Sequence, residues 1–243
     1  MPATLQTGSL GFDVVVLQTQ LNKKLTPPPN LSVDGAFGPL TRTAVVSFQR
    51  AAGLVADGIV GTRTHAALAQ GLVLTAVNHS VTHIAQPTPT TCWAASTAMM
   101  TRSTVAAVRA KTPASMKASD GGLLNSSETS QAVVTGTLYG NIHNLKCNAP
   151  MSWTTSALVS ALSRGPLMFD MLWNASEYVK GNGSPGHMVV VSAVVSDGNA
   201  AGHGTYLRVL DPWPPGQGKT SWVSYNSWMQ TVPTRTYRVF ERK

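Results

Sequence analysis

A short motif occurs twice in the first third of the chain and constrains its fold more than any other feature. The segment Asp34-Gly35-Ala36-Phe37-Gly38 recurs 23 residues later as Asp57-Gly58-Ile59-Val60-Gly61. Each Asp-Gly pair is typical of a turn, and the second glycine of each copy supplies a special backbone conformation. A repeat of this period corresponds to one short supersecondary unit. We therefore predict that each copy is a turn that leads into a helix.

Two stretches beside these turns carry apolar residues at helical spacing. The segments 13–24 and 43–52 are both predicted to be amphipathic helices, with Asp13 as the N-cap of the first. Their apolar positions are Val14, Leu17, Leu21, Val45, Val46 and Phe48.

With Leu17-Gln18 and Phe48-Gln49-Arg50 beside the doubled turn, residues 3–71 resemble the peptidoglycan-binding domain of many cell-wall hydrolases. The resemblance implies a small three-helix module that grips glycan strands or stem peptides in a shallow groove. The alternative is that the Asp-Gly turns only build a helical scaffold. We expect this module over residues 1–72, a linker over 73–85 and a second domain over 86–243.

Cys92 lies where a polar, proline-containing loop meets a helix-compatible run, in Gln86-Pro-Thr-Pro-Thr-Thr-Cys92-Trp93. A cysteine at a helix N-terminus faces the positive end of the helix dipole, which favours the nucleophilic thiolate. Gln86 offers a side-chain N–H that, beside the backbone N–H of Cys92, could point at an oxyanion. Farther along, His187 opens one apolar run and Asp211 follows another. This order predicts the nucleophile, base and orienting group of a cysteine hydrolase.

The Gln-x5-Cys-Trp spacing, the Gly-His before a valine-rich strand and the strand ending in Asp-Pro resemble the papain-like cysteine peptidases. The resemblance covers roughly residues 80–240, and the compact bacterial C39-like and AvrRpt2-like (C70) groups are nearer than the eukaryotic cathepsins. It implies Cys92 as nucleophile and His187 as general base and acid. It also implies Asp211 as the residue that orients the imidazole, and Gln86 in the oxyanion hole.

Each of these residues also has a structural explanation. A buried cysteine is commonly a small hydrophobe, a histidine at a strand edge is common, Asp211 could form a turn, and Gln86 could be a solvated loop amide. Their joint occurrence in one order favours function. Cys147 is not accompanied by comparable motif residues and is predicted to be structural.

A metal site is not expected. Some peptidoglycan-binding domains precede zinc amidases or carboxypeptidases, which need histidine and acidic ligands at metal spacing. His79 and His83 lie four residues apart, but they flank no glutamate and occupy a linker-like stretch. We therefore predict no metal ligands and no cofactor.

Charge and composition restrict the classes of molecule that the protein is expected to bind. The net charge of +8 suits an anionic polymer such as peptidoglycan with its attached phosphates. Nucleic acid is disfavoured because no basic stripe interleaved with aromatic residues is present. Two cysteines argue against a disulfide framework.

Features of a secretory signal peptide are missing from the first residues, and no window has the length of a transmembrane helix. We expect synthesis in the cytoplasm and action at the cell wall or periplasm, after export by a type VI-like system or phage lysis. A cognate immunity protein is a further expected partner.

The second domain is predicted to be α+β, with a helix that bears the nucleophile packed on an antiparallel sheet. Helices are expected over 92–107 and 154–164, and strands over 167–172, 187–195, 205–210, 221–225 and 236–240. The glycine-rich tract 181–186 is predicted to be a mobile loop over the cleft or a plain hairpin connection.

Together these features predict a wall-targeted papain-like cysteine hydrolase that cleaves amide bonds in peptidoglycan stem peptides or cross-links. One alternative is a cysteine protease that acts on protein substrates. Another is a peptidoglycan-binding protein without catalysis, which the complete set of Gln86, Cys92, His187 and Asp211 disfavours.

Overall fold

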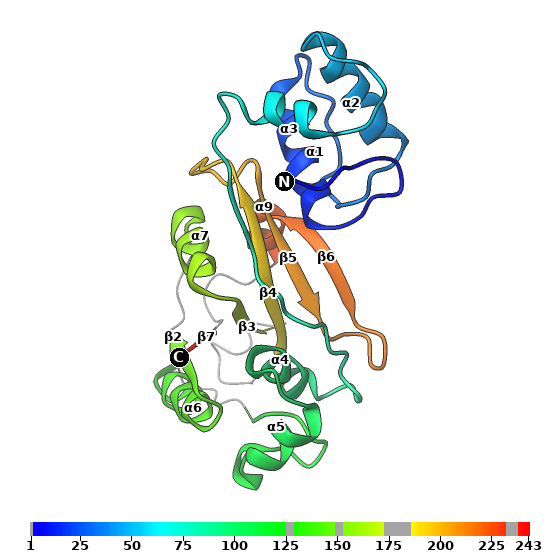
Figure 1. The fold of residues 1–243 in the computed structure, drawn as a ribbon. Helices are drawn as coiled ribbons and strands as arrows, with labels where there is room; N and C mark the ends of the chain where they lie inside the picture. The colour runs from blue at the N-terminus through cyan, green and yellow to red at the C-terminus, as the bar shows by residue number, and fades with distance from the viewer. Residues whose placement is uncertain (1, 125–128, 149–152, 173–185, 232–237) are drawn as a thin grey trace.

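A computed structural model describes residues 2–124, 129–148, 153–172, 186–231 and 238–243 of the chain. A small helical module is followed by a larger domain in which helices cover an antiparallel sheet (Figure 1). This confirms the predicted α+β class and the order of its two parts. No helix in the described part of the chain has the length and apolarity needed to cross a membrane.

Three short helices form the module: α1 (Phe12–Lys24), α2 (Pro39–Ala51) and α3 (Thr62–Ala69). Their apolar faces meet in one core that includes Leu17, Leu21, Val45, Phe48 and Leu68. The helices are amphipathic, so packing of these faces supplies most of the stability of such short elements.

The two copies of the repeated turn are held by the same hydrogen-bond network. Gln18 donates from Nε2 to Oδ1 of Asp34 (2.8 Å), while its Oε1 accepts the N–H of Gly35 (3.0 Å). In the second copy Gln49 contacts Asp57 (2.9 Å) and Gly58 (2.9 Å) in the same way. Gly35 and Gly58 have positive φ, 77° and 78°, which explains why glycine occupies these positions. The second glycine of each copy, Gly38 or Gly61, has φ of −90°, so the special conformation predicted there was wrong.

Asp13 is not the N-cap of α1, so that prediction was wrong. The helix begins at Phe12, and the carbonyl of Gly11 accepts the N–H groups of Val14 and Val15 at 3.1 and 3.2 Å. Asp13 instead lies in the first turn, where a carboxylate still interacts favourably with the helix dipole. Helix α2 begins at Pro39, earlier than predicted, because proline is well suited to the first position of a helix.

The sheet has the strand order β2-β7-β3-β4-β5-β6, with all pairs antiparallel, and β1 also pairs with β4. Strand β4 lies at its centre, with β5 along one edge and β3 followed by β1 along the other. The strands are β1 (Thr75–Asn78), β2 (Leu145–Asn148), β3 (Leu167–Leu172), β4 (Gly186–Ser196), β5 (Thr205–Asp211), β6 (Lys219–Ser224) and β7 (Arg238–Arg242).

Both faces of the sheet are covered. Alternate β4 residues pack toward α7 on one face and toward α4 on the other, as the two-residue period of a strand requires. This explains why β4 is almost continuously apolar. The helices of this domain are α4 (Cys92–Thr101), α5 (Val105–Lys111), α6 (Thr129–Ile142), α7 (Thr155–Arg164) and α9 (Tyr225–Thr231), with a 3-10 turn at Ala114–Met116.

The helix predicted over 92–107 is two helices. Arg102, with φ of 54°, adopts a left-handed conformation that ends α4. The side chain of Thr104 then accepts the N–H of Ala107 at 3.1 Å and caps the start of α5. The break arises because a good N-cap within the polar run Arg102-Ser103-Thr104 competes with continuation of the first helix.

Helix α4 is buried along almost its whole length, from Cys92 to Met100. Its hydroxyl groups are satisfied inside the core: Ser96 donates to the carbonyl of Met188 (2.7 Å) and Thr97 contacts the hydroxyl of Tyr139 (2.7 Å). A helix that is apolar on all sides belongs in a core. The Ser96 bond fixes α4 directly on β4.

Part of the predicted linker, residues 73–85, belongs to the sheet. Strand β1 lies in this segment and pairs with the second half of β4, with Thr75 opposite Ser196 and Asn78 opposite Ala193. Of the predicted glycine-rich loop over 181–186, residues 181–185 lie outside the described residues, and Gly186 begins β4.

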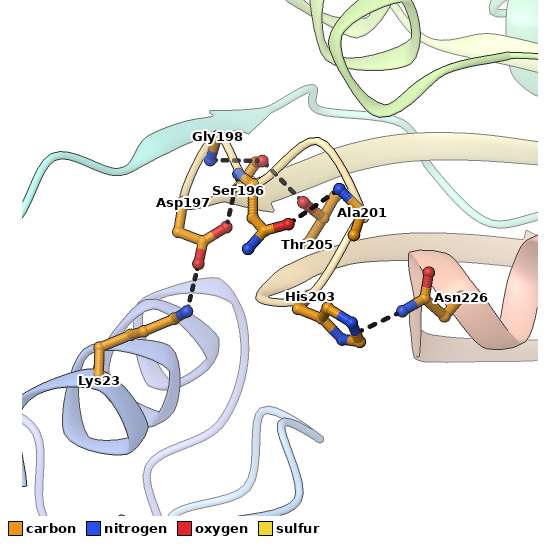
Figure 2. Close-up of polar contacts among 9 residues, drawn as sticks. Lys23, Ser196, Asp197, Gly198, Ala201, His203, Thr205 and Asn226 are labelled. Carbon is orange, nitrogen blue, oxygen red and sulfur yellow. Dashed lines mark hydrogen bonds and ion pairs between the residues drawn. The ribbon is translucent and has the colours of Figure 1, made fainter.

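The helical module docks on the end of the sheet farthest from α4 (Figure 1). Phe12 of α1 packs on Trp222 of β6, with ring centroids 5.9 Å apart, and Val15 is buried against Val195 of β4. Figure 2 shows Lys23 of α1 paired with Asp197 in the turn between β4 and β5. Apolar packing and an ion pair therefore join the two parts of the chain.

Candidate active site

Cys92 is the first residue of α4 and is 7% exposed. The carbonyl of the preceding residue, Thr91, accepts the N–H groups of Ala94 and Ala95, each at 3.1 Å. The first N–H groups of a helix have no acceptor within the helix. The thiol and the N–H of Cys92 therefore share the positive end of α4, as its sequence position suggested.

The second residue of β4, His187, contacts both other members of the predicted set. It is 6% exposed, and its Nε2 lies 2.7 Å from Oδ1 of Asp211. Its ring also forms a side-chain hydrogen bond with Cys92. Because Nε2 faces Asp211, Nδ1 is the ring nitrogen left for the thiol. The structure thus brings thiol, imidazole and carboxylate into one hydrogen-bonded line.

Interactions on two sides hold Asp211 at the end of β5. Its Oδ1 accepts the backbone N–H of Trp213 at 2.8 Å as well as the contact from His187. Its backbone carbonyl lies 2.8 Å from Nε2 of His83. The carboxylate that orients His187 is therefore itself oriented by the turn that follows it and by a distant imidazole.

His83 is a residue that the sequence did not identify as part of the site. Its ring packs on Gly218, where an added Cβ would lie 2.2 Å from Cε1 of His83. Its contact with Asp211 spans 128 residues, so no local spacing could have revealed it.

The pKa of His187 is raised from 6.5 to about 9. Burial is the largest single influence and disfavours the charged ring. The hydrogen bonds with Asp211 and Cys92, together with the negative charge of both groups, outweigh it. His187 therefore carries a proton at neutral pH, which a group that protonates a leaving amine needs.

Gln86 is fully buried and is tied to the segment that follows Asp211. Its backbone N–H donates to the carbonyl of Pro212 (3.0 Å), and its own carbonyl accepts from Gly216 (2.8 Å). One side-chain N–H is used by the carbonyl of Thr88, 2.7 Å from Nε2. Within the described residues its Oε1 has no hydrogen-bond partner. A buried amide oxygen without a hydrogen-bond partner is energetically unfavourable and needs an explanation.

The histidine pair and Cys147, which the sequence also singled out, lie outside the proposed catalytic set. His79 directs Nε2 at the carbonyl of Leu162 (2.6 Å), so both histidines of the spaced pair contact backbone oxygens. Among the described residues, no three His, Cys, Asp or Glu side chains are grouped to hold a metal ion. Cys147 of β2 is half-buried, and burial raises the pKa of its thiol. Both cysteines are free.

Residues 75–230 match the family described as papain-like cysteine protease AvrRpt2. The chain belongs to this family. Residues 11–68 match a second family, described as a putative peptidoglycan binding domain. The two matches follow one another along the chain in the order of its helical module and its sheet domain.

Curated relatives match over shorter stretches. The chain is 46% identical over 61 residues to a zinc D-Ala-D-Ala carboxypeptidase of Streptomyces albus G, covering 25% of this chain and 24% of that protein. It is 44% identical over 64 residues to a probable N-acetylmuramoyl-L-alanine amidase of Bacillus licheniformis, covering 26% and 18%. The chain thus spans a quarter or less of the length of these relatives.

Solved structures with similar segments include an endolysin of Burkholderia phage AP3, with 43% identity, coverage of 29% of this chain and 26% of that chain, and a TM-score of 0.26. Another is an L,D-transpeptidase of Xylanimonas cellulosilytica, with 27% identity, coverage of 35% and 56%, and a TM-score of 0.26.

Proposed function

We propose that this protein is a wall-targeted cysteine hydrolase that cleaves an amide bond in the stem peptides or cross-links of peptidoglycan. The observation that carries the proposal is the line from Cys92 through His187 to Asp211, in a domain to which a peptidoglycan-binding module is docked. A thiol, a base and an orienting carboxylate in this order are the parts of nucleophilic amide hydrolysis.

The chemistry follows from the positions of the three side chains. The Cys92 thiolate attacks the carbonyl carbon, and the negative charge moves to the carbonyl oxygen. Imidazolium His187 gives its proton to the amide nitrogen, the C–N bond breaks, and a thioester remains. His187 then takes a proton from water, whose oxygen attacks the thioester and releases the acid and the thiolate.

The oxyanion of each step needs N–H donors. The backbone N–H of Cys92 is available because it begins a helix, and Gln86 has a second amide N–H besides the one bonded to Thr88. The ties of Gln86 to Pro212 and Gly216 support this assignment, since they hold the glutamine beside the strand end that carries Asp211.

The module supports the wall as the place of action. A tethered active site meets wall amides at an effective concentration on the order of millimolar, even when its own affinity for them is weak. Export by a type VI-like system or release by phage lysis, and neutralisation by an immunity protein, belong to the same proposal. The zinc chemistry named for the carboxypeptidase relative is a property of that protein.

A cysteine protease acting on proteins is the second candidate, and the description of the matched family favours it. Digestion of purified sacculi, followed by separation of the muropeptides, tests the choice. We expect the wild-type protein, and not Cys92→Ala, to deplete one cross-linked or stem-peptide species. An unchanged muropeptide profile together with Cys92-dependent cleavage of casein would identify the protein-directed enzyme instead.

A further inference from the structure

A cavity lies at the end of α4 opposite to Cys92. Its volume is about 590 Å³, within the range of sites that bind small molecules. The end of α4, one face of α5, the start of β2 and the end of β7 enclose it. None of the proposed catalytic residues lines this cavity, so it is separate from the thiol site.

Basic side chains dominate the polar part of its wall. Arg102, Lys111, Arg242 and Lys243 all line the cavity, and no aspartate or glutamate does. None of the four forms an ion pair with a carboxylate among the described residues. Four cations around one small space repel each other unless an anion is present.

The local electrostatics reflect this repulsion. Burial lowers the pKa of Arg242, and the charge of Arg102 lowers it further. Burial also lowers the pKa of His143, at the base of the cavity, to about 4, and the charge of Lys111 adds to the effect. His143 is therefore neutral at pH 7, and its Nε2 lies 2.9 Å from the hydroxyl of Thr112.

The fold accounts for two of the four cations and leaves the other two unexplained. Arg242 donates to the carbonyl of Met100 at 2.6 Å and so satisfies the C-terminal end of α4. Lys243 contacts the side chain of Asn141 at 2.7 Å. The side chains of Arg102 and Lys111 are exposed and have no hydrogen-bond partner among the described residues.

Apolar side chains form the rest of the wall. Met100, Val108 and Leu145 are buried and line the cavity together with Ala107. The cavity is larger than a bare ion, so a phosphate that carries a small organic group would fill more of it. A phosphomonoester carries roughly −1.5 to −2 charge at neutral pH and offers three acceptor oxygens, which suits a cavity lined by several cations.

We propose that this cavity binds a small phosphate-bearing molecule, whose phosphate is held by Arg102, Lys111 and Lys243. Two sources carry a phosphate group: a free phosphomonoester, and the phosphodiester unit of a wall polymer, which has a single negative charge. The proposal does not depend on the hydrolase activity, because none of the proposed catalytic residues lines this cavity.

Isothermal titration calorimetry on the full chain, at constant ionic strength set with sodium chloride, tests the site with sn-glycerol 3-phosphate. We expect one saturable site that binds at least tenfold more weakly in the double variant Arg102→Gln, Lys111→Gln. The control Arg109→Gln, which is matched to the single variant Lys111→Gln, removes one positive charge from α5, the helix that bears Lys111, at a position that does not line the cavity. Its affinity should equal that of the wild type.

A second arm compares three titrants. Bis(glyceryl) phosphate binding more tightly than glycerol 3-phosphate identifies the polymer unit, and the reverse order identifies a free phosphomonoester. Citrate binding as tightly as either phosphate would overturn the assignment to phosphate. Absence of saturable heat, or equal weakening in Arg109→Gln, would overturn the site itself. The single variant Lys111→Gln, at an exposed position, keeps the test valid if the double variant does not fold.

Discussion

Nε2 of His187 and Oδ1 of Asp211 lie 2.7 Å apart, although 24 residues separate them in the chain. Their strands, β4 and β5, are antiparallel neighbours, and Val190 pairs with Leu210. The start of one strand therefore lies beside the end of the other, which places the imidazole next to the carboxylate. A simple hairpin topology is sufficient to build this half of the site.

Replacing either reacting group should abolish turnover. We expect Cys92→Ala and His187→Ala each to lower kcat by roughly a thousandfold or more, because groups that act as a unit lose their effect together. Cys147→Ala is the control and should retain wild-type activity, since its thiol lies on β2 outside the triad. Circular dichroism would check that each variant is folded. Near wild-type turnover by Cys92→Ala would exclude the thiol mechanism.

The loss of activity at alkaline pH should reflect deprotonation of His187. Its pKa of about 9 means that the proton needed by the leaving amine is present below pH 9 and lost above it, so kcat/KM should fall as pH rises through about 9. Asp211→Asn keeps an acceptor for His187 and Trp213 but removes the charge. The alkaline limb should then move down by roughly one unit or more, whereas an unmoved limb would separate Asp211 from the titration.

Gly218 should be needed for the alignment of Asp211 through His83. Gly218→Ala would place a Cβ 2.2 Å from Cε1 of His83 and 2.9 Å from the carbonyl of Asp211. We expect kcat to fall roughly ten- to a hundredfold with little change in KM. Gly216→Ala is a matched control, since Gly216 also has a positive φ, of 74°, but open space around it. Equal losses in both variants would point to backbone strain alone.

The module should be coupled to the sheet by Trp222. Trp222→Ala removes the partner of Phe12, and we expect it to lower the free energy of unfolding of the module by roughly 1–2 kcal/mol. Calorimetry should then resolve two unfolding transitions in place of one. Leu40→Ala, at a position that is 76% exposed on α2, should leave the single transition unchanged. Two transitions in the wild-type protein would show that the parts are already independent.

Strong local signals made much of the fold predictable. The run over 167–172 was predicted as a strand and is β3, and the helix predicted over 154–164 is α7, with Thr154 as its cap. The α7 segment carries Leu158 and Leu162 on one face and ends before Gly165, and β3 is a mostly apolar run that follows Pro166. The order of Cys92, His187 and Asp211 was also readable, because each lies at the end of such an element.

Features that depend on long-range contacts could not be predicted. Strand β1 is mostly exposed and owes its structure to pairing with β4, so its own residues show no alternation. The break after α4 occurs at Arg102, a residue type that does not favour the left-handed conformation it adopts. His83 joins the site only because β5 ends beside it.

The eleven residues of β4 run from the candidate active site to the docked helical module. At about 3.3 Å per residue, the strand holds the thiol roughly 30 Å from the docked module. On the proposed function, the stretch of polymer in the grip of the module is beyond the reach of the thiol. Each binding event would then allow cleavage only of neighbouring wall bonds, and cleavage elsewhere would require the module to dissociate first. A higher affinity of the module for the wall would therefore slow hydrolysis of intact walls, whereas hydrolysis of soluble fragments would keep the same rate.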